Sequence, residues 1–390
     1  MAEYAQVAIL GGQQDAVLSL SFSVCGRFLA ATGYTGVCVW DVIDYQDVPI
    51  PSLPAALSDR YVYTKSTWLQ FEDSSVPIFV LGSMRGEVTL WRWVGNRRAF
   101  SYSTRSKSST STEAVSVDVL RPNVPRGEQG RIALATADGH VTVWSVDAAA
   151  SELRQLFVIT LKSPFVLKTV KFDLPSRAIL AFSGTGGIVS RFNCDTGECE
   201  GSRQDAPNLM ASVVLDPAKS IYAAYTGTSI EIHSLKRKKN CVLSIKSEPP
   251  SIYYPMYMAL GEGGEVLLAG TDKGCALLYD VVDGKVLQSL EYPKGGLVQQ
   301  VATCGAAGPH LLAIAGSSIR RSADVILFRK SREPPPAPQR APVIAPKGDI
   351  PGKTTACECL AWTTIWMVML ALLAVLYIST LEHKLKATAH

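Results

Sequence analysis

Hydrophobic and polar residues follow one recurring order over the first 330 residues of the chain. An alternating apolar strand comes first, and after a turn comes a strand of small and apolar residues such as FLAATG at 28–33. A tight turn that ends in glycine follows, and then an alternating strand closed by an aromatic residue. The order recurs at roughly 40 to 50 residues, the spacing of blades in ring-shaped repeat proteins. The pattern therefore predicts an all-β ring of repeated sheets.

Seven copies of this order are found, at 16–42, 66–93, 114–146, 165–193, 211–233, 265–281 and 297–328. The first copy is the clearest, because its third strand ends in Trp40-Asp41. In the fifth copy the turn glycine is displaced to Gly227. Glycine at these turns fits backbone with positive φ, and the aromatic residues fit the wedge between neighbouring blades. The glycines at 184–187 are interpreted in the same way, as a hairpin turn.

The seven copies resemble the WD-repeat family over residues 1–330, although Trp40-Asp41 is the one literal WD pair and the family's structural histidine is absent from its slot. The resemblance implies a seven-bladed β-propeller of four-stranded blades, with an N-terminal strand that completes the last blade. Tyr4–Leu10 is placed to be that strand. Closing the ring in this way removes two exposed sheet edges.

The segment after the repeats changes character twice. Residues 331–353 contain seven prolines, and the segment 331–356 is therefore predicted to be an extended stalk. Alternatively, residues 335–340 could be a ligand for a proline-recognising domain. Residues 357–381 predict a transmembrane helix, because 359–381 carries no charge and is long enough to span a bilayer core. Its aromatic residues lie towards the two ends, which favours a span over a buried core helix. Residues 382–390 form a short tail beyond it.

The position of the span predicts how the chain meets its membrane. The N-terminus lacks a basic start and a long apolar run, so it does not resemble a secretory signal. A span this close to the C-terminus inserts after synthesis, as in tail-anchored proteins, and leaves the propeller in the cytosol. None of the five asparagines begins a glycosylation sequence, which agrees with this topology. The endoplasmic reticulum is the expected membrane, with the mitochondrial outer membrane as the alternative.

The remaining chemistry favours binding over catalysis. There is no phosphate loop, nucleophile elbow or metal-spaced Cys/His group, and a formal charge of +4 predicts no nucleic-acid surface. Cys194 and Cys199 are interpreted as unpaired thiols, and His140 and His233 as structural histidines in third strands. We therefore expect no enzyme, cofactor, metal or small-molecule substrate.

Three features are candidates for binding or regulation. Residues 96–114 are rich in Ser and Thr and predict an exposed loop with phosphorylation sites at Ser106, Ser108 and Ser109, an unmodified loop being the alternative. Lys236, Arg237, Lys238 and Lys239 form a run that could contact anionic lipid or remain a solvated turn. Cys357 and Cys359 adjoin the cytosolic end of the span, where reversible palmitoylation occurs.

These features predict a membrane-tethered, non-enzymatic scaffold for cytosolic proteins. The alternative is a regulator of a small GTPase, since the architecture is similar to the endoplasmic-reticulum exchange factors for the Sar-type GTPase of vesicle-coat assembly. Activity in that family depends on a glycine-rich, cation-binding loop with an essential Asn in the first blade. The corresponding segment here, AATGYTGVCVW at 30–40, contains neither, so no catalytic residue is assigned.

Overall fold

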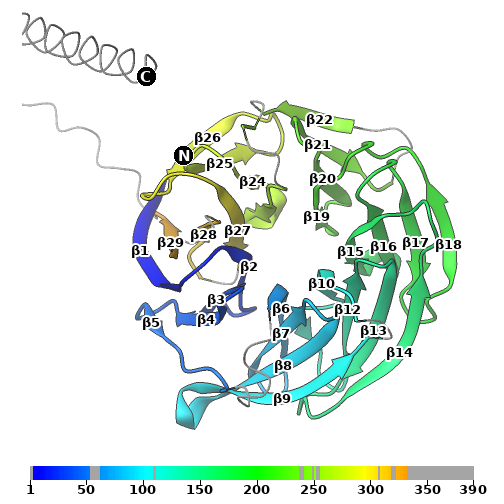
Figure 1. The fold of residues 1–390 in the computed structure, drawn as a ribbon, viewed down its shortest axis with the longest axis horizontal. Helices are drawn as coiled ribbons and strands as arrows, with labels where there is room; N and C mark the ends of the chain where they lie inside the picture. Colours follow the sequence, from blue (N-terminus) through cyan, green and yellow to red (C-terminus); the bar gives the residue numbers. More distant parts are fainter. Residues whose placement is uncertain are drawn as a thin grey trace, which may run out of the picture. The chain divides into compact units, whose positions relative to one another are not determined.

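The computed structural model describes residues 3–52, 62–108, 111–236, 241–247, 250–251, 255–305, 308–317 and 322–331. They belong to a compact unit, Met1–Pro335. Seven mainly antiparallel sheets form a closed ring (Figure 1), so the predicted all-β, seven-bladed propeller is confirmed. In the described ranges, no helix has the length and apolar character needed to cross a membrane. The predicted span, the tail and all but Ser331 of the predicted stalk lie outside those ranges.

The first four blades each begin with the strand nearest the ring centre. Blade one contains β2 (Val17–Phe22), β3 (Phe28–Gly33), β4 (Gly36–Asp41) and β5 (Gln46–Asp47). Blade two contains β6 (Tyr63–Phe71), β7 (Pro77–Ser83), β8 (Glu87–Val94) and β9 (Ala99–Lys107), and β11 (Asn123–Val124) adds to β6 in parallel. Blade three contains β10 (Ala114–Val119), β12 (Gly130–Thr136), β13 (His140–Val146) and β14 (Leu153–Thr160). Blade four contains β15 (Leu167–Asp173), β16 (Ala178–Ser183), β17 (Val189–Asn193) and β18 (Cys199–Arg203).

The last three blades keep the same order. Blade five contains β19 (Ser212–Asp216), β20 (Ile221–Tyr225), β21 (Ser229–Ser234) and β22 (Cys241–Lys246). Blade six contains β23 (Met258–Gly261), β24 (Val266–Gly270), β25 (Cys275–Asp280) and β26 (Val286–Glu291). Blade seven contains β27 (Val298–Cys304), β28 (Leu311–Gly316), β29 (Ala323–Lys330) and β1 (Tyr4–Gln13). The described helices are the single 3-10 turns η1 (Gly95–Arg97), η2 (Leu174–Ser176) and η3 (Glu262–Gly264).

The N-terminal strand closes the ring, as the sequence predicts. β1 pairs antiparallel with β29, from Tyr4 opposite Lys330 to Gln13 opposite Ala323, and the two strands lie side by side in Figure 1. Tyr4 also reaches blade six, where its hydroxyl donates to Glu262 Oε1 at 2.7 Å. Closure therefore joins the two ends of the propeller by a continuous ladder and by side-chain contacts to a neighbouring blade.

Seven clusters of buried apolar side chains hold the ring together, and each lies between two neighbouring blades. One position in the third strand of every blade contributes to this packing. In chain order it holds Trp40, Trp91, Trp144, Phe192, His233, Tyr279 and Phe328. Aromatic rings fill the wedge in six blades, as predicted. Blade five instead places an imidazole there, stacked on Tyr222 with ring centroids 5.1 Å apart.

Positive backbone φ explains the turn glycines between the second and third strands. At Gly139, φ is +87° and a Cβ atom would lie 2.9 Å from the Leu161 carbonyl oxygen. At Gly187, φ is +64° and a Cβ would lie 2.4 Å from the Ala206 carbonyl oxygen. The predicted hairpin turn at 184–187 is confirmed, because it connects β16 to β17.

The predicted loop at 96–114 is wrong over residues 99–107. After η1, residues 99–107 form β9, which pairs with β8 from Val94 opposite Ala99 to Glu87 opposite Lys107. This edge strand of blade two is mostly half-buried or exposed, so hydroxyl side chains are tolerated along it. The Ser and Thr content indicates a loop, whereas the alternation around Phe100 and Tyr102 is compatible with a strand.

Candidate functional site

The first strands of the seven blades surround a central channel (Figure 1). A cavity of about 160 Å³ in this channel is lined by residues from all seven of them. Those that lie near the start of these strands are mostly polar: Ser19, Lys65, Ser116, Thr169, Ser212, Met258 and Gln300. The channel therefore offers hydroxyl and ammonium groups to a ligand that reaches it.

Two lysines give the channel positive charge. Lys65 Nζ donates to the Tyr257 hydroxyl at 3.0 Å and lies 4.5 Å from the centre of its ring. The Lys65 ammonium lowers the pKa of the Tyr257 phenol, and Lys168 contributes in the same direction. Among the described residues, neither lysine has an ion-pair partner within 4.0 Å. Their charges are therefore available to an anionic group.

A third channel lysine is already neutralised. Lys171 Nζ lies 2.9 Å from Asp118 Oδ1, and the other Asp118 oxygen accepts from the Phe172 backbone N–H at 2.8 Å. The carboxylate thus bridges blades three and four. Because this pair is internally satisfied, the cationic channel site is defined here as Lys65, Lys168 and Tyr257.

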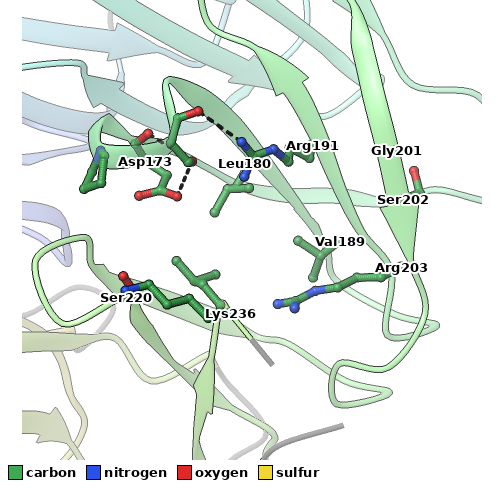
Figure 2. Close-up of a pocket in the computed structure, with 12 residues that line it drawn as sticks. Asp173, Leu180, Val189, Arg191, Gly201, Ser202, Arg203, Ser220 and Lys236 are labelled. Atoms are coloured by element: carbon green, nitrogen blue, oxygen red, sulfur yellow. Dashed lines mark hydrogen bonds between the residues drawn. The ribbon is translucent and has the colours of Figure 1, made fainter. Parts of the chain in front are cut away.

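A second cavity, of about 500 Å³, lies between blades four and five (Figure 2). Blade four contributes Arg191 and Arg203, and Lys236 follows the third strand of blade five. Both guanidinium groups have acidic partners: Arg191 Nε lies 2.6 Å from Glu200 Oε2, and Arg203 Nε lies 3.5 Å from Asp205 Oδ1. The positive charges of the two arginines in this cavity are therefore balanced.

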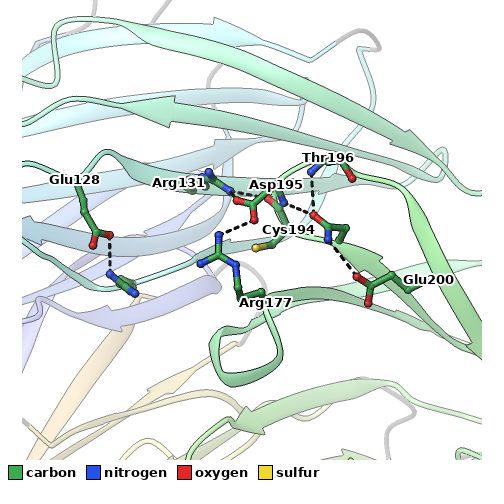
Figure 3. A network of polar contacts seen from close by, with 9 residues as sticks. Glu128, Arg131, Arg177, Cys194, Asp195, Thr196 and Glu200 are labelled. Atoms are coloured by element: carbon green, nitrogen blue, oxygen red, sulfur yellow. Dashed lines mark hydrogen bonds and ion pairs between the residues drawn. The ribbon is translucent and has the colours of Figure 1, made fainter.

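Blades three and four are also joined by a polar network (Figure 3). Arg131 donates to the Cys194 carbonyl oxygen at 2.8 Å and to Asp195, while Arg177 Nη2 donates to the other Asp195 oxygen at 2.6 Å. The hydrogen bond from Arg177, together with Arg131, holds the pKa of Asp195 below its usual range. Both arginines are held by one acid, so we interpret this network as a structural clasp.

The predicted phosphorylation sites occupy less accessible places than a loop would give them. Ser106 lies in β9, and its Oγ accepts from Trp144 Nε1 of blade three at 3.1 Å. Ser108 follows the strand and is only 5% exposed. Ser109 lies outside the described residues. Modification at these positions stays a prediction, and at Ser106 it would replace an inter-blade hydrogen bond.

The other predicted sites are covered only in part by the described residues. Lys236 lines the second cavity, whereas Arg237, Lys238 and Lys239 are outside those residues. Cys357 and Cys359 are outside them too. Lipid contact and palmitoylation therefore stay predictions.

The cysteines and histidines considered from sequence are placed individually. Cys194 is buried, and burial raises the pKa of its thiol, whereas Cys199 is exposed at the start of β18. His140 Nδ1 lies 3.3 Å from Asp138 Oδ1. His233 lies beside Glu231 and Cys241, and the ligand atoms of these three residues are all within 4.8 Å of one another. Sequence reasoning missed this group, because only the pairing of β21 with β22 brings Cys241 opposite His233.

Sequence reasoning also missed the cationic channel site. Lys65 and Lys168 lie near the starts of the first strands of copies two and four, and Tyr257 directly precedes that of copy six. The sequence carries a signal, because lysines recur near the start of the first strand in copies two and four. The recurring glycines and aromatics lie in other strands and turns of each copy, and they do not indicate that these lysines meet.

This architecture places the chain among the β-propeller proteins, and it is compatible with the WD-repeat type. Compared with protein-family models and with curated proteins, the sequence has no match. In blade one, β3 and β4 are connected by Tyr34 and Thr35 alone. The described connection between β3 and β4 thus contains no inserted loop.

Proposed function

We propose that this protein is a non-enzymatic scaffold, whose propeller binds an acidic segment of a cytosolic protein at the cationic channel site. The observation that carries the proposal is the arrangement of Lys65 and Lys168 around Tyr257, in a channel whose lining residues near the strand starts are mostly polar. Carboxylates are attracted to such a site both at long range and by charge-assisted hydrogen bonds. A propeller also suits this role, since it presents loops on a rigid ring.

The proposal includes the membrane. Residues 357–381 would hold the propeller at an intracellular membrane, for which the endoplasmic reticulum is our first choice. The support is the uncharged stretch at 359–381 and the proline-rich segment that precedes it. The exchange-factor alternative has no supporting observation in blade one, and we do not propose it.

Proximity labelling tests both parts. A labelling enzyme is fused at Met1 of the full chain, and its labelled proteins are compared with those of a chain truncated after Lys353. A small set of cytosolic proteins that depends on the C-terminal segment would support a tethered scaffold. Coat components with their GTPase in that set would favour the alternative, and labelling of no cytosolic protein would overturn the topology.

A charge-reversal pair tests the channel. Lys65→Glu with Lys168→Glu should reduce recovery of the partners at least about tenfold, since attraction becomes repulsion. Arg154→Glu with Lys246→Glu changes the same charge on exposed positions of outermost strands and serves as the control. Equal loss in both double variants, or no loss in the channel variant, would reject the channel as the binding site.

A further inference from the structure

One blade of the propeller departs from the others at three neighbouring positions. In blade four the third-strand aromatic position is Phe192, the residue two before it is Ser190, and the outer-strand partner is Cys199. In blade five the same positions hold His233, Glu231 and Cys241. Both blades have a register irregularity directly before the aromatic position, so the two sites are matched in backbone. Blade five alone of the pair combines imidazole, carboxylate and thiol.

These three side chains converge. His233 Nε2 lies 2.9 Å from Glu231 Oε2, and the thiol of Cys241 completes a group whose ligand atoms lie within 4.8 Å of one another. Alternate residues of a strand share a face, which explains the first contact, and cross-strand pairing supplies the thiol. We propose that Glu231, His233 and Cys241 form a zinc-binding site with three protein ligands and one open position.

The donors suit that ion. Zinc takes imidazole nitrogen, thiolate sulfur and carboxylate oxygen at about 2.0 to 2.3 Å in tetrahedral geometry, so two ligands of one ion lie about 3.5 Å apart. The observed group needs shifts of roughly 1 Å to reach this arrangement. Cys241 is exposed and begins the edge strand β22, so it has room to shift. On binding, the thiol proton is released to solvent.

The surroundings of the site orient the His233 ring and favour a cation beside Glu231 and Cys241. His233 is 6% exposed and is held by stacking on Tyr222, so its ring is already oriented. The Cys241 sulfur and the Glu231 carboxylate belong to the same group of ligand atoms, within 4.8 Å of one another. A dication between a thiolate and a carboxylate at this separation would remove their mutual repulsion. Arg203, whose guanidinium carbon lies 5.9 Å from the Tyr222 ring centre, is a nearby cation, and its charge is paired with Asp205.

The test is metal titration of the full-length chain, purified without a histidine tag, kept reduced and stripped with a chelator. We expect one Zn²⁺ per chain, and with Co²⁺ as the probe a near-ultraviolet thiolate charge-transfer band. Cys241→Ser should abolish the band, and Glu231→Gln should weaken Zn²⁺ binding at least about tenfold. Cys199→Ser is the matched control and should keep both signals. Absence of Zn²⁺ binding by the wild-type chain at micromolar concentrations would overturn the proposal.

A second variant separates ligand loss from misfolding. His233→Phe gives blade five the ring that blade four already has at this position, so the metal-free variant should melt like the metal-free wild type. It should also have lost Zn²⁺ binding, and its melting temperature should no longer rise with added Zn²⁺. Zn²⁺ binding that persists unchanged in both His233→Phe and Cys241→Ser would place the metal elsewhere and reject this site.

Discussion

The interface between blades two and three differs from that between blades four and five. The first buries sixteen apolar residues among those described, including Trp144, which is 0% exposed. The second buries seven in the same described part of the chain and lies beside the cavity of about 500 Å³. The interface whose third-strand residue is Trp144 is thus filled by apolar side chains, whereas the interface whose third-strand residue is His233 has a smaller apolar cluster beside a cavity. The comparison indicates that the interface between blades two and three contributes more apolar burial to the ring than the interface between blades four and five.

The largest expected effect on the free energy of unfolding comes from opening the ring, because both interfaces belong to the same closed ring. Deleting residues 3–12 removes all of β1 except Gln13 and leaves β29 with an exposed edge. We expect a loss of at least about 5 kcal/mol, comparable to the stability of a whole domain, and no cooperative urea transition by circular dichroism. Ile9→Ser changes an exposed side chain of the same strand and should stay within about 0.5 kcal/mol. A cooperative transition in the deletion chain would show that closure is dispensable.

Truncating the wedge residue should separate the two interfaces. Trp144→Ala removes the largest side chain of the filled wedge and its hydrogen bond to Ser106, so it should cost about 3 to 5 kcal/mol. His233→Ala, at the same repeat position of the open interface, should cost only about 1 to 2 kcal/mol. Urea unfolding of the metal-free chains measures both. Equal costs would mean that the open interface is as important for stability as the filled one.

The parts of the fold that could be predicted from the sequence are those marked by residues that recur once in each blade. The third-strand aromatics and turn glycines recur in every blade or nearly so and predict the blade count, and the resemblance that they carry to the WD-repeat family implies the closing strand. The fourth strands carry no such mark. β9 is a polar edge strand whose serines and threonines also fit a loop, and its structure is decided by pairing with β8.

The candidate sites were less predictable, for a related reason. Lys65, Lys168 and Tyr257 come from three blades, and they approach one another only because the ring closes. Glu231 and Cys241 join His233 through a cross-strand pair that no linear spacing rule describes. Sites of this kind depend on tertiary neighbours, whereas the fold depends on a repeated local pattern.

Exchanging the third-strand residues of the two matched blades sharpens the comparison further. Phe192→His places an imidazole among apolar side chains of the blade three and four cluster, and it should cost about 1 to 2 kcal/mol. His233→Phe should change the stability of the metal-free chain by less than about 1 kcal/mol, because Tyr222 already offers an aromatic partner. Thermal melting at pH 7 measures both. A larger cost for His233→Phe than for Phe192→His would show that the imidazole is required for stability without metal.

The smallest expected effect concerns the Asp195 clasp between blades three and four. The pKa of Asp195 is lowered from its usual 3.8, first by Arg177 and then by Arg131. A carboxyl whose pKa is lower in the folded state stabilises the fold at pH values above its usual pKa. This stabilisation is lost as the pH falls through the lower pKa of the folded state. Asp195→Asn should therefore cost about 0.5 to 1 kcal/mol at pH 7, a figure kept small because the carboxylate is partly solvent-screened. Urea unfolding at several pH values measures this difference.

The shape of the pH dependence is what identifies the clasp. The difference between Asp195→Asn and the wild type should be constant from pH 7 to about pH 5 and shrink below pH 4, where the carboxyl of the unfolded wild-type chain takes up its proton before that of the folded chain. Asp283→Asn, which breaks a solvent-exposed pair with Lys285 within one turn of blade six, should have a smaller effect at every pH. If the Asp195 difference were the same at pH 3 and pH 7, the cost would come from packing, and the charge would not contribute to holding blades three and four together.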